Sequence, residues 1–185
     1  MRRKGVERKM KVVLGVTGSI AAYKACELVR LLVKRGDDVR VVMTAAAQRF
    51  VTPLTFQTLS RNPVGTDQFA PVAEWRPEHI SLADADAVVV APATANIIAK
   101  MAHGIADDLL SATLLATRAP VFVAPAMNDG MWDNPATQAN LETVRSRKVT
   151  IIDPGSGELA CGTEGKGRFA DPAAIVEAVH NGVRL

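Results

Sequence analysis

The chain alternates between short apolar runs and longer segments in which apolar residues recur every three or four positions. A continuous apolar run closed by glycine, such as KVVLGVTG, is typical of a strand covered on both faces. After Ile20 the period becomes helical, with one apolar face. We expect strands at 11–18, 39–44, 87–93, 120–126 and 149–153. We expect helices at 20–35, 53–60, 79–85, 94–104, 107–119, 134–147 and 171–182.

Strands and helices that alternate at short spacing predict right-handed βαβ crossovers and an open parallel sheet. The length of 185 residues suits one domain, and neither a repeat nor an interdomain linker interrupts the pattern. We therefore expect the α/β class, with a single Rossmann-like or flavodoxin-like doubly wound parallel sheet and helices on both faces. Residues 1–10 would form a basic tail and residues 11–185 the domain.

Composition narrows the class of protein. Hydrophobic residues make up 48% of the chain and aromatic residues only 4%, so Val, Ile, Leu and Ala must fill the core. Much of the net charge of +3 lies in the first ten residues, and no basic stripe with interleaved aromatics follows, so we expect no nucleic-acid partner. No apolar run is long enough for a membrane span, and the tail lacks the apolar core of a signal peptide.

The two cysteines, Cys26 and Cys161, lie far apart and form no CxxC pair. This spacing excludes a disulfide framework and a standard zinc site, so we expect no metal and a reducing, cytoplasmic location. Cys26 lies among Ala and Leu in a helix and is expected to be a small core residue.

Four segments at the predicted carboxyl ends of strands depart from ordinary turns, and ligands of such sheets bind at that edge. GVTGSIAAYK offers Gly18, Ser19 and a helix start, where backbone amides can approach an anion. The segment is neither GxGxxG nor a P-loop, and a mononucleotide phosphate fits it better than NAD. The residues alone are equally compatible with an ordinary strand–helix turn.

The segments APATAN and APAMN end two strands in the same way. Small side chains let a flat ring lie against the backbone, while Thr94 and Asn96 can reach its edge. The repetition indicates that the two strand ends flank one planar ligand. The fourth segment, MTAAA, lies at the end of the second strand.

The remaining candidates are histidines and a glycine-rich segment. His79 precedes an apolar helical turn, and its spacing alone favours a structural residue over a catalytic one. His103 and His180 are expected to be helix C-terminal residues favoured by the helix dipole. Residues 153–172 contain five glycines and Cys161, a composition that suits a mobile lid without much fixed structure.

Taken together, these motifs resemble a known family. GVTGSIAAYK, PATAN, GIADDLLS, PAMN followed by MW and NPATQ, and ACGTEGKGR occur in the order found in the homo-oligomeric flavin-containing cysteine decarboxylases. The resemblance covers residues 11–172, and His79 and Cys161 complete the set. Each motif alone is weak, and their order makes the resemblance specific.

The resemblance implies an FMN site near a subunit interface, with the phosphate at Gly18, Ser19 and the following helix. It implies these FMN contacts: Gly18, Ser19, Ile20, Thr44, Thr94, Ala95, Asn96 and Ala126. It also implies that His79 and Cys161 are catalytic and that Asn128 binds the substrate carboxylate. Asp107 departs from the pattern, because many relatives carry asparagine there; an extra carboxylate would either perturb flavin contacts or make another hydrogen bond.

The members it resembles most closely act on 4′-phosphopantothenoylcysteine, which they convert to 4′-phosphopantetheine in coenzyme A biosynthesis. The implied course is thiol oxidation, decarboxylation and re-reduction, with Cys161 as the acid of the reductive half. The resemblance implies a homotrimer or a dodecamer of trimers, and a phosphopantothenate–cysteine ligase as a fused or separate partner.

Other functions on this scaffold remain open from the sequence. An oxidative decarboxylase of peptide C-terminal cysteines would stop at the ene-thiol, which Cys161 in the glycine-rich segment argues against. A flavin prenyltransferase would share the fold without the combination of PAMN and that segment. A non-catalytic regulatory protein that inhibits a phosphatase would carry long acidic or Ser-rich extensions, which this sequence lacks.

Overall fold

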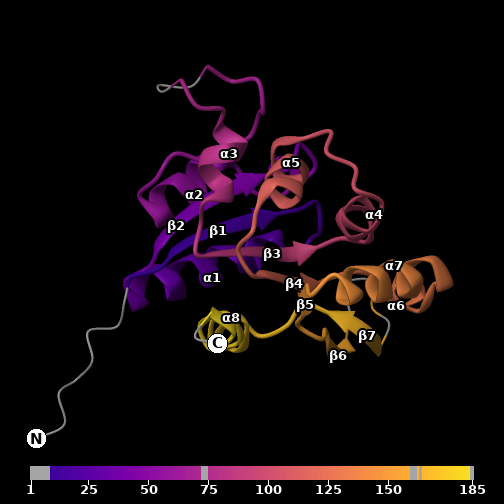
Figure 1. Ribbon diagram of the computed structural model, residues 1–185. Coiled ribbons are helices and arrows are strands. Elements are labelled where there is room, and N and C mark those ends of the chain that lie inside the picture. The colour runs from indigo at the N-terminus through magenta and orange to yellow at the C-terminus, as the bar shows by residue number, and fades with distance from the viewer. Residues whose placement is uncertain (1–8, 72–74, 159–161, 163, 184–185) are drawn as a thin grey trace, which may run out of the picture.

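A five-stranded parallel sheet forms the centre of the molecule (Figure 1). The computed structural model describes residues 9–71, 75–158, 162 and 164–183. The strand order is β2-β1-β3-β4-β5, and every pairing in this sheet is parallel. The strands are β1 (Lys11–Val16), β2 (Asp38–Met43), β3 (Ala87–Ala93), β4 (Val121–Pro125) and β5 (Thr150–Ile151). The predicted doubly wound sheet is therefore confirmed, although β5 has only two residues.

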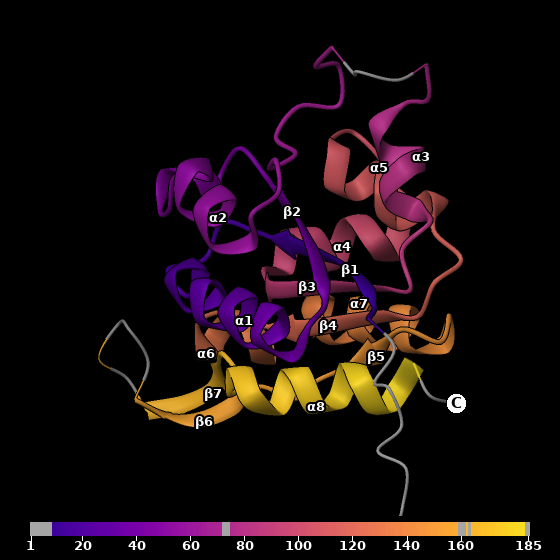
Figure 2. The ribbon, with the colours of Figure 1, turned by 90° about the vertical axis from the view of Figure 1, so that its left-hand side faces the viewer.

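Helices cover both faces of the sheet (Figure 2). They are η1 (Ala47–Arg49, a 3-10 turn), α1 (Ala22–Arg35), α2 (Pro53–Ser60), α3 (Glu78–Ala83), α4 (Ala95–His103), α5 (Leu109–Ala116), α6 (Asp129–Asp133), α7 (Pro135–Ser146) and α8 (Pro172–Val183). Val12, Leu14 and Val16 of β1 pack with α1 and α8, whereas Val13 packs with α4, α5 and α7 on the opposite face. Alternate residues of a strand point to opposite faces, so the continuous apolar run fills two cores.

The glycine-rich segment contains more fixed structure than its composition indicates. An antiparallel hairpin of β6 (Gly155–Glu158) and β7 (Glu164–Arg168) forms there and extends past the start of α8 (Figure 2). The short helix α6 was also not predicted. Cys161 and the neighbouring residues 159, 160 and 163 lie outside the described part of the chain, as do residues 1–8 of the basic tail.

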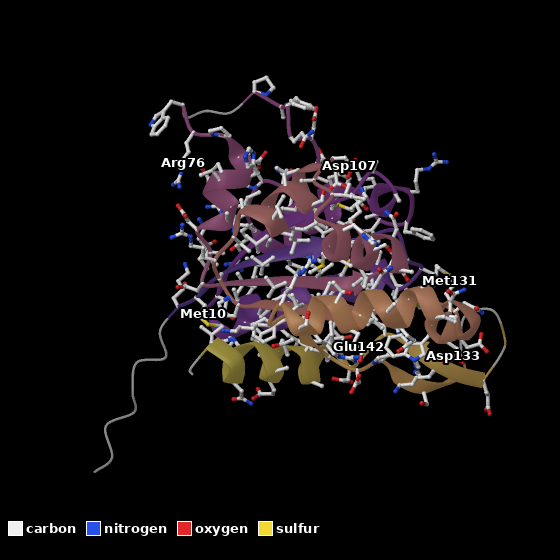
Figure 3. All side chains as sticks on the ribbon, turned by 45° about the vertical axis from the view of Figure 1, so that its right-hand side comes forward. Met10, Arg76, Asp107, Met131, Asp133 and Glu142 are labelled. Carbon is white, nitrogen blue, oxygen red and sulfur yellow. The ribbon has the colours of Figure 1, made fainter. Side chains whose placement is uncertain are left out.

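A buried polar cluster joins the chain's first described residues to its last helix. His180 Nε2 lies 2.8 Å from Asp37 Oδ2, and both side chains are almost fully buried. The Met10 amide donates to Asp37 Oδ1 at 3.4 Å, and Met10 lies where the chain enters the sheet, close to α8 (Figure 3). His180 is therefore a partner in a buried pair rather than the dipole-favoured helix-end residue that the sequence predicted. Met10, placed in the tail by sequence, is buried.

Candidate functional site

A cavity of about 590 Å³ lies at the carboxyl ends of the strands. Its walls are the turn after β1, the start of α1, the residues after β3 and β4, and the end of β7. In the order β2-β1-β3-β4-β5, β2 lies on one side of β1, and β3 and the later strands lie on the other. The crevice at this switch point between β1 and β3 is where such folds bind ligands.

The turn between β1 and α1 is held by close backbone packing. A Cβ at Gly18 would lie 2.5 Å from the Cβ of Ala46, so only glycine lets the two loops approach this closely. The Ser19 carbonyl and hydroxyl accept from Ala22 and Ala21, respectively. Among the described residues, no protein group accepts from the backbone amides of Gly18 and Ile20. Such amides at a helix start favour an anion.

Thr17 ties the two strands that flank the switch point. Its hydroxyl donates to the Pro92 carbonyl at 2.7 Å and accepts from the Thr94 amide at 3.0 Å. Thr94 in turn caps α4 by accepting from the Ile97 amide. Thr17 was not among the predicted site residues. The available signal was a hydroxyl at the end of an apolar strand, which must find hydrogen-bond partners once it is buried.

Residues 126–128 leave β4 along a path set by backbone hydrogen bonds. The Ala126 amide donates to the Ala93 carbonyl at 3.0 Å, and the Met127 amide donates to the Gly167 carbonyl at 3.1 Å. Asn128 Oδ1 accepts from the Gly130 amide at 2.9 Å and caps α6. This cap fixes which side of the Asn128 amide carries the oxygen, and Asn128 lines the cavity.

The β6–β7 hairpin is docked on this loop rather than detached from it. Gly167 has a φ of 132°, and a Cβ there would collide with the Met127 carbonyl oxygen. Lys166 Nζ lies 5.4 Å from the ring centroid of Trp132, a buried residue of α6. The base of the predicted lid is thus fixed to the wall of the cavity.

The structure brings together six of the residues implicated by sequence. Gly18, Ser19, Ile20, Thr94, Ala126 and Asn128 all line the cavity. Eight further lining residues were not predicted: Ala21, Tyr23, Lys24, Met127, Met131, Gly167, Arg168 and Phe169. The available signal was that all of them except Phe169 lie within the GVTGSIAAYK, PAMN, MW and GKGR motifs.

Other predicted residues lie beside the cavity or away from it. Thr44 is close to the turn between β1 and α1, because its amide donates to the Val16 carbonyl at 3.1 Å. Ala95 and Asn96 form the first turn of α4. His79 lies on α3, which packs against α5, and is not a lining residue. Its neighbour Glu78 has a raised pKa because burial disfavours the charged carboxylate.

Asp107 makes a further ionic contact at some distance from the cavity. Lys100 Nζ lies 2.5 Å from Asp107 Oδ1 and 2.7 Å from Asp108 Oδ2. Figure 3 shows Asp107 well separated from Met131, which lines the cavity. Within one chain, the extra carboxylate therefore pairs with Lys100.

Asp108 caps α5 through a reciprocal pair of hydrogen bonds with Ser111. Burial alone would raise the pKa of Asp108, but the hydrogen bonds from Lys100 and Ser111 outweigh it and lower that pKa. Burial would likewise lower the pKa of Lys100, and the two carboxylates raise it instead.

Comparisons by sequence and by structure both find that this chain is similar to flavoproteins. A family model described as Flavoprotein matches residues 1–184. The coenzyme A biosynthesis bifunctional protein CoaBC of Bacillus subtilis (strain 168) is 52% identical over 167 residues, which cover 90% of this chain and 41% of that protein. The chain thus spans less than half the length of this relative.

Two solved structures match over nearly the whole chain. A PPC decarboxylase mutant complexed with pantothenoylaminoethenethiol has a TM-score of 0.86 and 33% identity, covering 96% of this chain and 100% of that one. The FMN-dependent cysteine decarboxylase SpaF has a TM-score of 0.83 and 31% identity, covering 95% and 98%. Among the described residues, none of the helices has the length and apolar character that a membrane crossing requires.

Proposed function

Since the chain belongs to the flavoprotein family, we propose that it binds FMN and decarboxylates 4′-phosphopantothenoylcysteine to 4′-phosphopantetheine. The observation that carries this proposal is that one cavity combines an anion-binding turn at residues 18–20 with the side chain of Asn128. The names of the similar proteins support it, because one is a PPC decarboxylase and another belongs to coenzyme A biosynthesis.

The residues present fit FMN. The amides of Gly18 and Ile20, together with the start of α1, would hold its phosphate. Ala126 is buried and has a minimal side chain, which gives a flat ring room against the backbone. Thr44, Thr94, Ala95 and Asn96 would lie along the rest of the cofactor.

FMN, when bound, would supply the two-electron oxidation and later reduction of the thiol carbon, without which loss of carbon dioxide would leave an unstabilised carbanion. The chain's own residues would bind, orient and protonate. Asn128, held by its cap to Gly130, would donate to the substrate carboxylate. The hairpin docked on Met127 would keep water from the reacting atoms.

The role proposed for His79 requires a second copy of the chain. It lies on α3, away from the cavity of its own chain. We therefore place His79 of a second copy at the cavity, in the trimer that the family resemblance implies, where it would act as an acid–base group. A dodecamer of trimers is the larger assembly compatible with the proposal.

Cys161 would protonate the intermediate during its reduction. The PPC decarboxylase in complex with pantothenoylaminoethenethiol is a Cys-to-Ser mutant, and an ene-thiol is the compound expected to persist when that proton is missing. The substrate would come from a phosphopantothenate–cysteine ligase, fused to this domain or separate, in the cytoplasm.

The test begins with the visible spectrum of the purified protein. 4′-Phosphopantothenoylcysteine is then added, and carbon dioxide and product mass are followed. A flavin spectrum with 4′-phosphopantetheine as product supports the proposal. A product two hydrogens lighter indicates an oxidative decarboxylase instead. A protein that neither contains flavin nor takes up added FMN contradicts the proposed cofactor.

A further inference from the structure

Thr17 joins the carboxyl ends of β1 and β3 beyond the point where their regular pairing stops. The last paired residues of the two strands are Gly15 and Val90. Past that point the Thr17 hydroxyl donates to the Pro92 carbonyl at 2.7 Å and accepts from the Thr94 amide at 3.0 Å. The Thr17 amide adds a longer bond to the same carbonyl, at 3.3 Å. The side chain of Thr17 therefore supplies the two shorter contacts between these strand ends.

A hydroxyl suits both of these contacts at once. Thr17 is 2% exposed, and its partners are a carbonyl, which only accepts, and an amide, which only donates. A hydroxyl donates and accepts, whereas valine has nearly the same shape and does neither. The Thr94 amide lies at the N-cap of α4, where the backbone is still extended. Replacing the hydroxyl by a methyl group would therefore leave this amide without its partner.

Each end of this connection leads directly to a wall of the cavity. Residues 18–20, which follow Thr17, line the cavity and form the turn that favours an anion. Thr94 lines the cavity as well, and caps α4 by accepting from the Ile97 amide. Thr17 itself does not line the cavity. It therefore acts on a ligand through the residues that it holds.

The turn is held against the end of β2 by contacts that do not involve the Thr17 side chain. A Cβ at Gly18 would lie 2.5 Å from the Cβ of Ala46, and the Thr44 amide donates to the Val16 carbonyl at 3.1 Å. The position of the turn relative to the end of β3 depends instead on Thr17. A substitution there should shift the Thr94 segment relative to the turn while the contacts with β2 remain.

We propose that Thr17 is a positioning residue for FMN: its hydroxyl sets the spacing between the phosphate-binding turn at residues 18–20 and Thr94, so that one flavin nucleotide reaches both. This inference rests on the proposed function. A ligand bound at two points gains most when the points are already at the right separation, because no binding energy is then used to order them. Loosening the connection should weaken FMN binding mainly by speeding its release.

The experiment compares FMN release from four proteins: the wild type, Thr17→Val, Thr17→Ser and Thr113→Val. Thr113 is the matched control, because it is fully buried and its hydroxyl donates to the Leu109 carbonyl at 2.7 Å within α5, away from the cavity. Each protein is loaded with FMN and diluted, and the rise of flavin fluorescence gives the release rate. Titration with FMN gives the dissociation constant, and urea unfolding gives the midpoint of each protein.

We expect Thr17→Val to raise the dissociation constant of FMN about 5- to 30-fold, mostly through faster release. Thr17→Ser keeps the donor and acceptor and should stay within about threefold of the wild type. Thr113→Val also loses a buried hydroxyl, so its urea midpoint should fall, but its FMN affinity should change less than about twofold. The assignment is overturned if Thr17→Val holds FMN like the wild type, if Thr17→Ser is as weak as Thr17→Val, or if Thr113→Val loses as much affinity.

Hydrogen exchange shows where the structure loosens. Amide exchange of residues 91–98 is followed by mass spectrometry in the FMN-loaded wild type, Thr17→Val and Thr113→Val. Exchange in this segment should be at least about fivefold faster in Thr17→Val, because the Thr94 amide and the start of α4 lose their support. Thr113→Val should exchange there like the wild type. Equal exchange in all three proteins would contradict the positioning role.

These measurements separate the inference from the proposed activity, since none of them requires turnover. A wild type that binds FMN but does not decarboxylate 4′-phosphopantothenoylcysteine refutes the proposed reaction, while the comparison of variants still decides the role of Thr17. An active wild type whose Thr17→Val variant releases FMN at the native rate refutes only the role of Thr17. A wild type that takes up no FMN refutes both the proposed cofactor and this assignment.

Discussion

The carbonyl oxygen of Met127 occupies the space that a side chain at position 167 would need. The same two residues are joined by a hydrogen bond from the Met127 amide to the Gly167 carbonyl. The loop that carries Asn128 and the base of the β6–β7 hairpin are thus fixed against each other at one glycine.

Gly167→Ala should therefore disturb the site more than an ordinary glycine substitution does. The alanine must adopt a φ near 132° and its Cβ must displace the Met127 carbonyl. We expect a loss of about 2–4 kcal/mol in unfolding free energy and a fall of at least about tenfold in decarboxylation. Urea unfolding and product formation measure the two effects.

Gly36→Ala is the matched control for that variant. Gly36 also has a positive φ, of 101°, but no atom lies within 4 Å of the Cβ position. Gly36→Ala should lower the unfolding free energy by only about 1–2 kcal/mol, because the alanine is strained by its positive φ but makes no collision. Activity should be unchanged. Equal effects of the two substitutions would show that the contact with Met127 is unimportant.

The low pKa of Asp108 predicts a pH-dependent contribution to stability. A carboxyl group with a lower pKa when folded stabilises the protein above its unfolded pKa of about 3.9 and loses that contribution as the pH falls through the folded pKa. Asp108→Asn keeps the cap to Ser111 but not the charge beside Lys100. The variant should be about 1 kcal/mol less stable at pH 7 and match the wild type near pH 2.

Asp107→Asn serves as the comparison, because its side chain is 61% exposed in its pair with Lys100. It should change stability by less than about 1 kcal/mol at pH 7. The prediction for Asp108 fails if unfolding free energies of wild type and Asp108→Asn differ equally at both pH values.

Asn128→Asp separates the structural role of this residue from its proposed chemical role. A carboxylate still accepts from the Gly130 amide, so α6 and the thermal unfolding temperature should be preserved. A negative charge facing the substrate carboxylate should lower kcat/KM at least about 100-fold. Unchanged turnover in a folded, flavin-containing variant would remove Asn128 from the site.

His79→Asn tests whether the site is shared between copies of the chain. The variant should retain bound flavin and lose decarboxylation, since His79 lies outside the cavity of its own chain. When it is refolded together with Asn128→Asp, some cavities receive a native Asn128 and a native His79 from different copies. Activity should then return in part. No recovery in a verified mixed assembly contradicts the shared site.

The buried pair of His180 and Asp37 should contribute measurably to stability. Removing either side chain leaves a buried polar partner, which we expect to cost about 3 kcal/mol. The variants His180→Ala, Asp37→Ala and the double variant form a cycle in urea unfolding. A coupling energy of about 1–3 kcal/mol is expected, and additive losses would show that the two residues act independently.

Local signals predicted much of the fold. Asn134 and Asp171 cap their helices as expected, and the apolar runs became parallel strands. The hairpin could not be predicted, because its glycines are held by the loop after β4 rather than by their own propensity. The pairing of His180 with Asp37 was missed for a similar reason, since 143 positions separate the two residues.

Six of the residues predicted for the site line one cavity, whereas the positions of other lining residues were not predicted. Gly18, Ser19 and Asn128 converge because parallel strands end at one edge of the sheet. Arg168 and Phe169 were not identified, since their position depends on how the hairpin docks. The position of His79 away from the cavity could not be read from periodicity, which describes one helix and not how the helices pack.

The hydrogen bonds that fix Ala126 and Met127 run from backbone to backbone, to the carbonyls of Ala93 and Gly167. Their geometry does not depend on which side chains residues 126 and 127 carry. Mutation can therefore alter the lining of this wall without moving it, as long as Gly167 is kept. Such an arrangement makes the scaffold evolvable: new ligands can be accommodated by exchanging side chains on a loop whose path is already determined.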